Sequence, residues 1–246
     1  MTAALDGRAA GPVLELRGVT KVYQGTPPVT ALAGVDLSVQ AGELTAVLGP
    51  SGSGKTTLLH LAGTLDRPSA GTAAVTGPDI AALSDRQLAA LRATSIGFVF
   101  QHFFLAEHAS VLDNVADALL YAGVSLASRR RQAARALEQV GLDDRLTARP
   151  PQLSGGQRQR VAIARALAGQ PAIVLADKPT GNLDSATGQS VLALLEELNA
   201  DGATIVVVTH DQAVAARMHR QITMLDGRIV TDTAAVPVSR GAAAGS

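Results

Sequence analysis

The sequence predicts an α/β fold built on a mostly parallel sheet, and three observations lead to this class. Short apolar runs of strand length alternate along the chain with longer amphipathic stretches of helix length, which is the order that βαβ units produce. A glycine-rich loop joins an apolar run to a helical pattern. Several apolar runs also end in a polar residue, where parallel strands can present functional side chains.

The expected strands are short apolar or alternating segments. In chain order they fall within residues 13–23, 31–49, 95–101, 172–177 and 203–211. The first two alternate apolar and polar residues before a continuous apolar run, which indicates half-buried strands leading into a buried one.

The expected helices fall between these strands, within residues 55–65, 84–93, 111–123, 128–141 and 153–171. Ser84 and Ser154 stand where N-caps are expected, and glycines follow several of the patterns. The stretch of about 102–170 contains only helical patterns, so we expect an inserted helical lobe. Residues 1–12 and 234–246 are expected to be flexible ends.

The composition narrows the function classes. Of 246 residues, 47% are apolar, so a sizeable core is expected. Lys and Arg number 21 and Asp and Glu number 21, so the formal net charge is zero. Nucleic-acid binders usually carry a basic excess, and we therefore expect no nucleic-acid partner. The absence of cysteine excludes disulfides and thiolate metal sites.

The sequence shows neither the pattern of a membrane-spanning helix nor that of a signal peptide. No stretch approaches the roughly 18 to 20 apolar residues that a membrane-spanning helix needs. The first twelve residues lack the basic start and apolar run of a signal peptide. The sequence therefore predicts a cytosolic location, with any membrane role reached through a partner.

The glycine-rich loop fits the phosphate-binding pattern G-x-x-x-x-G-K-[ST] and lies between an expected strand and an expected helix. Its glycines let backbone N–H groups turn towards phosphate oxygens, and the helix dipole points to the same place. A lysine supplies a cation for the β- and γ-phosphates, and a threonine hydroxyl can bind Mg²⁺. The alternative is a Gly/Ser-rich turn with an incidental lysine. The predicted nucleotide-binding residues are Gly49, Pro50, Ser51, Gly52, Ser53, Gly54, Lys55, Thr56 and Thr57.

A carboxylate follows the strand expected at 172–177. Asp177 ends that apolar run, and beside a phosphate loop such a carboxylate usually holds Mg²⁺, directly or through water. Without the loop, a solvated strand end would be the better interpretation. The predicted metal residues are Thr56, Gln101 and Asp177, and the predicted cofactors are ATP and Mg²⁺.

The segment "LSGGQ", residues 153–157, resembles the signature of ABC transporter ATP-binding subunits. The resemblance extends over about residues 13–231, with every motif in family order. It implies a P-loop NTPase of ABC type, formed as one domain over residues 13–233 with an added antiparallel β lobe. "PTGNLDS" looks most similar to the lipoprotein-release and macrolide-export group.

The resemblance also implies roles for single residues. Tyr23 corresponds to the aromatic residue that stacks on adenine. Gln101 corresponds to the glutamine that senses Mg²⁺ and the γ-phosphate. Asp184 belongs to the loop that crosses the dimer interface, and His210 corresponds to the switch histidine at the γ-phosphate. Taken singly, each would more often be a structural residue.

The signature has a physical interpretation as well. Ser154, Gly155, Gly156 and Gln157 begin a predicted helix, whose N–H groups can cap the helix or bind an anion. In the family this site meets ATP held by another subunit. The resemblance therefore implies a partner that is a second copy of the chain or a homologous ATPase.

One position departs from the family pattern. The residue after Asp177, where the family has the glutamate that polarises the attacking water, is Lys178. A protonated lysine cannot accept a proton, and general-base assistance is typically worth about 10²- to 10⁴-fold in rate. We therefore expect impaired hydrolysis, even if the lysine side chain turns away into solvent.

Several explanations of this lysine stay open. The chain can be a naturally degenerate subunit, a variant that traps the ATP state, or an ATPase in which another group, with His210 nearest, positions the water. Because every other motif is intact, an altered form of an ordinary ATPase is favoured. The competing hypothesis is a non-hydrolysing, ATP-gated regulatory or scaffolding module.

Residues 100–115 contain three of the four phenylalanines. They either pack beneath the helical lobe or line a groove for a short helix of an integral-membrane permease, which the family docks here. The second interpretation implies a peripheral position at the cytoplasmic face of the cell membrane. The cargo cannot be predicted, because partner proteins would select it.

Overall fold

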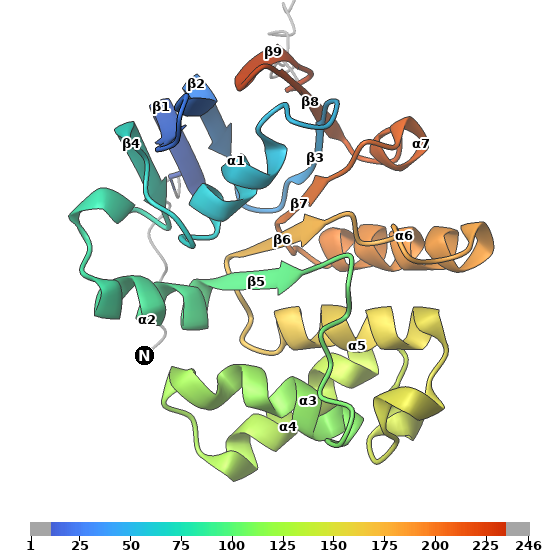
Figure 1. The fold of residues 1–246 in the computed structure, drawn as a ribbon. Coiled ribbons are helices and arrows are strands. Elements are labelled where there is room, and N and C mark those ends of the chain that lie inside the picture. Colours follow the sequence, from blue (N-terminus) through green and yellow to red (C-terminus); the bar gives the residue numbers. More distant parts are fainter. Residues whose placement is uncertain (1–10, 235–246) are drawn as a thin grey trace, which may run out of the picture.

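The computed structural model describes residues 11–234, and a six-stranded sheet lies at its centre (Figure 1). The strand order is β5-β6-β7-β3-β8-β9, and only the last pair is antiparallel. The predicted mostly parallel sheet is therefore confirmed. The strands are β3 (Leu44–Leu48), β5 (Ile96–Val99), β6 (Ile173–Asp177), β7 (Ile205–Val208), β8 (Arg220–Leu225) and β9 (Arg228–Asp232).

A second sheet forms the antiparallel lobe. It consists of β1 (Leu14–Tyr23), β2 (Val29–Val39) and β4 (Ala70–Val75) in the order β2-β1-β4. In β1, Leu14, Leu16 and Val19 are buried while the residues between them are more exposed, because one face packs on the core and the other meets solvent. The expected antiparallel β lobe is therefore confirmed.

Seven α-helices connect the strands in the described part of the chain. They are α1 (Lys55–Ala62), α2 (Asp85–Ser95), α3 (Val111–Ala116), α4 (Leu126–Gln139), α5 (Gly155–Leu167), α6 (Ser185–Ala200) and α7 (Gln212–Ala215). Short 3₁₀ turns lie at Ile80–Ala82, Asp117–Ala122, Asp143–Arg145 and Pro150–Gln152. The predicted N-caps are present, since Ser84 and Ser154 each accept a hydrogen bond from the backbone three residues on.

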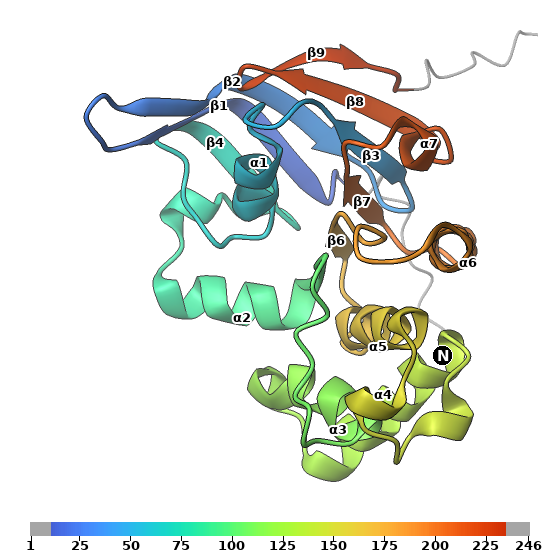
Figure 2. The ribbon, with the colours of Figure 1, turned by 45° about the vertical axis from the view of Figure 1, so that its right-hand side comes forward.

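The elements stack in layers on the two faces of the central sheet. Helix α1 lies between this sheet and the antiparallel lobe, while α5 and α6 cover the opposite face, with α3 and α4 beyond α5 (Figures 1 and 2). Two apolar clusters fill these layers, and β3 contributes to both, because Val47 faces the α1 side and Ala46 the α5 side. The carboxyl ends of β3, β6 and β7 consequently meet at one edge.

The stretch between β5 and β6 contains only helices and their connections. No helix within residues 11–234 is long and apolar enough to cross a membrane. Apart from residues 11, 12 and 234, the ends predicted to be flexible lie outside the described residues.

Candidate nucleotide-binding site

The glycine-rich loop connects the carboxyl end of β3 to the first turn of α1. Gly49 has φ 150° and Gly54 has φ 97°, and a Cβ atom at these positions would collide with the carbonyl oxygens of Met224 and Ala31. Only glycine fits such positions without strain. The loop is therefore shaped by close backbone approach, as a phosphate cradle requires.

Lys55 lies at the centre of this loop. Its Nζ donates to the carbonyl oxygens of Gly49 (2.8 Å) and Pro50 (2.7 Å) and contacts Ser53 Oγ at 3.1 Å. The side chain is 8% exposed. Burial lowers the pKa of Lys55, as does the nearby charge of Lys178, and Asp177 acts in the opposite direction. The ammonium thus rests on neutral oxygens that incoming phosphate oxygens can replace.

A cavity of about 670 Å³ opens over the loop. Lys55, Thr56 and Thr57 line it from α1, while Lys178 and His210 enter from the ends of β6 and β7. Val29, Thr30 and Ala31 of β2 also line it, and the sequence pattern gave no signal for this part of the wall beyond strand-like alternation. The side chains of Lys55, Lys178 and His210 therefore meet at one cavity beside the phosphate loop.

Asp177 ends β6 beside this cavity. Its Oδ1 is buried and has no hydrogen-bond partner among the described atoms. A buried carboxylate oxygen without a donor is costly, and a cation would satisfy it. Mg²⁺ usually takes one or two carboxylates plus phosphates and water, so a single carboxylate is compatible with this ion. Asp177 and the hydroxyl of Thr56 therefore fit the predicted metal.

Lys178 follows Asp177 in the left-handed region, with φ 45°. Its N–H donates to Val208 O at 2.8 Å, and its carbonyl accepts from Gly181 N at 3.0 Å. These bonds fix the backbone on both sides of the turn. The side chain is half-buried and lines the phosphate cavity with Lys55. The lysine thus faces the site instead of turning away into solvent.

Tyr23 and Gln101 lie outside the residues that line the cavity. Tyr23 ends β1, its hydroxyl donates to Asp66 Oδ2 at 3.1 Å, and its strand partner Val29 belongs to the cavity wall. Tyr23 is 39% exposed at this rim, and Lys21 Nζ lies 5.0 Å from the centroid of its ring. The carboxamide of Gln101 instead bonds to Asn182, a contact that sequence reasoning missed.

The signature residues form the start of α5. Ser154 Oγ accepts from Gln157 N at 3.2 Å, and Gln157 Oε1 accepts from Ser154 N at 3.0 Å. Gly156 is buried against Thr187, and a Cβ there would collide with its methyl group. This helix start packs beside the turn of Asp184, which caps α6 by accepting from Thr187 N at 3.0 Å.

The signature and the phosphate cavity are separate within one chain. None of Ser154, Gly155, Gly156 or Gln157 lines the cavity, and α1 and α5 lie on opposite faces of the central sheet (Figure 1). The first N–H groups of a helix are not used within it and can bind an anion. The phosphate loop and the start of α5 are therefore two separate candidate contacts for phosphate.

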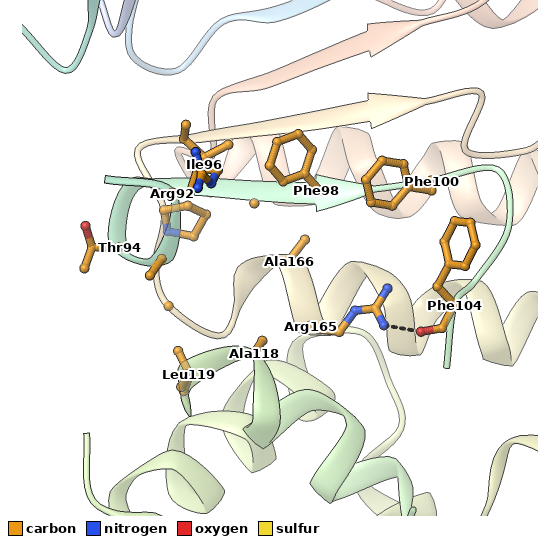
Figure 3. A pocket seen from close by; sticks show the side chains of 14 residues that line it. Arg92, Thr94, Ile96, Phe98, Phe100, Phe104, Ala118, Leu119, Arg165 and Ala166 are labelled. Atoms are coloured by element: carbon orange, nitrogen blue, oxygen red, sulfur yellow. Dashed lines mark hydrogen bonds between the residues drawn. The ribbon is translucent and has the colours of Figure 1, made fainter. Parts of the chain in front are cut away.

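A second hollow, of about 390 Å³, lies between β5, α2 and the helices beyond (Figure 3). Phe98, Phe100 and Phe104 line it; the first two rings stack at 5.6 Å, and Phe104 meets Phe100 edge-on at 5.7 Å. Phe104 is 67% exposed. Phe103 does not line the hollow. The centroid of its ring instead lies 5.2 Å from the guanidinium of Arg158.

Two arginines face this hollow, and no acidic residue lines it. Arg92 donates to Thr64 O at 2.6 Å, and Arg165 donates to Phe104 O at 2.7 Å and Phe103 O at 2.9 Å. Burial lowers the pKa of Arg165. The hollow is thus an aromatic surface with cations that have carbonyl partners and no carboxylate.

Comparison with known families gives one matching model, described as ABC transporter, over residues 32–181. Among curated relatives, the macrolide export ATP-binding/permease protein MacB of Hyphomonas neptunium is 48% identical over 223 residues, 90% of this chain and 35% of the relative. The pyoverdine export ATP-binding/permease protein PvdT of Pseudomonas putida is 49% identical over 228 residues, 92% and 35% of the two chains. The chain thus spans about a third of the length of the curated relatives it matches.

Solved structures give the same picture. The ATP-binding cassette MJ0796, a dimer in a post-hydrolysis state bound to ADP and Pi, is 43% identical with a TM-score of 0.79, covering 89% of this chain and 97% of that one. The cbiO1 protein of Clostridium perfringens, part of the transporter complex cbiONQ, is 29% identical with a TM-score of 0.80, covering 90% and 88%.

Proposed function

Because the chain belongs to the ABC transporter family as an ATP-binding domain, we propose that it is the motor of an exporter and that it dimerises around Mg-ATP. Export is supported by the names of the curated relatives, which are macrolide and pyoverdine exporters. The dimer is supported by the solved cassette described as dimeric with ADP and Pi.

The observation that carries the proposal is the separation of the two half-sites. The phosphate loop of one chain provides a cradle, Lys55 and the Asp177 carboxylate, and the start of α5 provides anion-binding N–H groups elsewhere on the surface. Two copies related by a two-fold axis would complete two sites at once. ATP would then hold the pair together, and its loss would let the copies part.

Each residue has a defined part in this arrangement. The loop N–H groups and Lys55 bind the β- and γ-phosphates, Tyr23 stacks on the base, and His210 contacts the γ-phosphate. Asp177, Thr56 and Gln101 would hold Mg²⁺, which neutralises charge that develops on the phosphates. The Asp184 turn lies beside the signature helix at the interface.

The experiment that tests this proposal is equilibrium sedimentation of the purified chain with and without Mg-ATP. We expect a monomer without nucleotide and a dimer with Mg-ATP, and we expect Lys55→Ala to stay monomeric. Ser84→Ala serves as the control, because it removes a helix cap at a residue that does not line the cavity. A Lys55→Ala chain that bound ATP and paired like the parent would overturn the proposal.

Hydrolysis in this chain is proposed to be slow. Lys178 stands at the position of the general base and lines the cavity, where an ammonium group attracts phosphate oxygens but cannot take a proton from water. The same observation favours a second candidate function, a non-hydrolysing ATP-gated module. Phosphate release by a Lys178→Glu chain separates the two, because only an ATPase that lacks its base should gain turnover from the carboxylate.

The aromatic hollow is proposed to receive a membrane subunit at the cytoplasmic face of the membrane. Its phenylalanines suit the apolar face of a short helix, and its two arginines, which lack acidic partners in the described chain, suit a carboxylate or a helix C-terminus on that partner. We therefore propose that the docking helix has apolar residues on one face and an acidic residue beside them.

A further inference from the structure

Asn182 joins two loops at the carboxyl edge of the sheet. It lies between β6 and α6, and all of its side-chain hydrogen bonds reach the segment that follows β5. Asn182 Oδ1 accepts from Gln101 Nε2 at 3.0 Å, Asn182 Nδ2 donates to Gln101 O at 3.0 Å, and the same Nδ2 lies 3.2 Å from His102 Nδ1.

Hydrogen-bond chemistry fixes the direction of both amides in this contact. A backbone carbonyl can only accept, so the Asn182 group that faces Gln101 O must be the NH₂. The Asn182 oxygen then faces the side chain of Gln101 and requires a donor there. The Gln101 NH₂ must supply it, which leaves Gln101 Oε1 as the acceptor directed elsewhere.

Gly181, the residue before Asn182, allows the Gln101 side chain to lie close to this turn. A Cβ atom on Gly181 would lie 3.0 Å from Cδ and Nε2 of Gln101, which is tighter than ordinary van der Waals contact. Gly181 N in turn donates to Lys178 O at 3.0 Å. The turn that carries Asn182 is thus tied to the residue after Asp177.

The sheet register brings Gln101 to the same edge as Asp177. Val99 pairs with Ala176, the residue before Asp177, and Gln101 follows Val99 by two positions. Oxygen ligands are what Mg²⁺ prefers, and a carboxamide presented by its nitrogen cannot bind a cation. Which end of the Gln101 amide is free therefore decides whether it can act on the metal.

We propose that Asn182 is a positioning residue that holds the Gln101 amide with its oxygen free for the Mg²⁺ of bound Mg-ATP. This inference rests on the proposed function, because it takes Gln101 as a metal-sensing group. Without Asn182, the amide turns freely and presents nitrogen or oxygen. Asn182 then acts on the Mg²⁺ dependence of ATP binding and not on ATP binding itself.

The test is the ATP dissociation constant, measured with Mg²⁺ and with EDTA, for four chains: the parent, Asn182→Ala, Gln101→Ala and the double variant. The quantity compared is the factor by which Mg²⁺ tightens binding. In Asn182→Ala we expect this factor to fall about 3- to 10-fold, the size of one lost hydrogen bond. The affinity in EDTA should stay within twofold of the parent.

The double variant shows whether Asn182 works through Gln101. If it does, Asn182→Ala has no further effect in the Gln101→Ala background. Asn182→Asp is a second variant, since its carboxylate can still accept from Gln101 Nε2 but cannot donate to Gln101 O. Because the acceptor that orients the Gln101 amide remains, this variant should keep more of the Mg²⁺ factor than Asn182→Ala. Thermal melting of each chain checks that the folds remain comparable.

Two results overturn the inference. In the first, Asn182→Ala changes the ATP affinity equally with Mg²⁺ and with EDTA. In the second, the effect of Asn182→Ala persists in full in the Gln101→Ala background. Either result would mean that Asn182 only stabilises the loop structure. Failure of the proposed function looks different, because the parent itself would then show no ATP binding or no Mg²⁺ effect.

Discussion

Among single residues, Lys178 stands out because its side chain lines the phosphate cavity together with Lys55, and we propose that it occupies the position of the family's general base. The neighbouring residues are consistent with a nucleotide site in other respects, since the Lys55 loop and His210 line the same cavity as Lys178. Asp177, whose Oδ1 has no hydrogen-bond partner among the described atoms, directly precedes Lys178. The departure is thus confined to one side chain. Its two consequences, loss of proton acceptance and gain of positive charge, can be separated by substitution.

Restoring a carboxylate tests the first consequence. We expect Lys178→Glu to release phosphate about 10²- to 10⁴-fold faster than the parent, because general-base assistance has this size. Lys178→Gln is the matched control, since it removes the charge without supplying a base, and it should remain slow. The measurement is steady-state phosphate release at saturating Mg-ATP. Equal turnover by all three chains would mean that another group positions the water.

At the scale of elements, a salt-bridge network ties the antiparallel end of the sheet to its centre. Arg220 of β8 donates to both carboxylate oxygens of Asp232 on β9, at 2.8 and 2.7 Å, to Glu43 at 2.7 Å and to Ser38 O at 2.7 Å. Its side chain is 12% exposed. The guanidinium lowers the pKa of Asp232, and that carboxylate in turn raises the pKa of Arg220.

Removing Arg220 should therefore destabilise the fold without touching the nucleotide cavity. We expect Arg220→Ala to lower the free energy of unfolding by about 1.5 to 3 kcal/mol, the range for hydrogen bonds to charged groups. Urea denaturation measures this loss. Arg17→Ala is the control, because its pair with Glu15 is largely solvent-exposed and worth little. A loss no larger than that of the control would contradict the network's role.

The same network predicts a pH dependence. Because the pKa of Asp232 is lowered in the folded state, its contribution is complete above the ordinary value of about 3.9 and is lost as the pH falls through the folded value. The parent should therefore lose more stability than Arg220→Ala as the pH falls below about 4. An equal loss of unfolding free energy in the parent and in Arg220→Ala over this pH range would contradict the prediction.

The aromatic hollow can be tested as a docking surface by removing its exposed phenylalanine. We expect Phe104→Ala to weaken co-purification of the cognate membrane subunit and to leave ATP binding unchanged, since Phe104 lines the hollow and not the phosphate cavity. Tyr121→Ala is the matched control, because Tyr121 is 83% exposed but lies outside the hollow. Co-purification that survives Phe104→Ala unchanged would argue against docking in this hollow.

The fold and the candidate site differ in how far local pattern predicts them. Strands with continuous apolar runs, such as β6, and helices with a capping serine, such as α5, were predicted because their signal is local. Helix α6 is not among the predicted helices, although Asp184 is its N-cap, because the segment around Asp184 resembles the interface loop of the family and is interpreted only as that loop. Strand β4 was also missed, since its sequence AGTAAV is poor in residues that favour strands.

The contacts of the candidate site were harder to predict than its residues. The phosphate loop, Asp177 and the signature are contiguous motifs, and sequence alone placed them on the correct elements. The Gln101–Asn182 contact joins residues 81 positions apart, and the β2 wall of the cavity depends on how the two sheets pack. Contacts between residues that are distant in sequence follow from tertiary structure, and they leave no repeating pattern in the local sequence.

In the whole molecule, the central sheet separates the phosphate loop from the signature at the start of α5. Helix α1 carries the cradle on one face and α5 carries the signature on the other (Figures 1 and 2). A chain cannot bring its own helix start to its own phosphate loop without unfolding the layers between them. Completion of the site in a dimer is therefore an expectation of the fold itself, and it can be tested by complementation.

Two defective chains should rescue each other when mixed. Lys55→Ala removes the cradle but leaves the signature, whereas Ser154→Asp keeps an N-cap and places a negative charge where phosphate would bind. Neither should dimerise alone with Mg-ATP. A mixed dimer, however, contains one site built from the intact cradle of one chain and the intact signature of the other.

The expected effect of the mixture is large enough to measure. Two unit charges 4 Å apart interact by about 4 kcal/mol at an effective dielectric constant of about 20, which corresponds to roughly 10³-fold in a dimerisation constant. Because one site of the mixed dimer escapes this repulsion, mixing the variants at equal concentration with Mg-ATP should produce dimers that neither forms alone. Sedimentation with one variant fluorescently labelled measures their fraction. The contrary result is a labelled chain that sediments as a monomer in the mixture while the parent dimerises. In that case the phosphate loop of one chain does not pair with the signature of the other, and the proposed shared site is wrong.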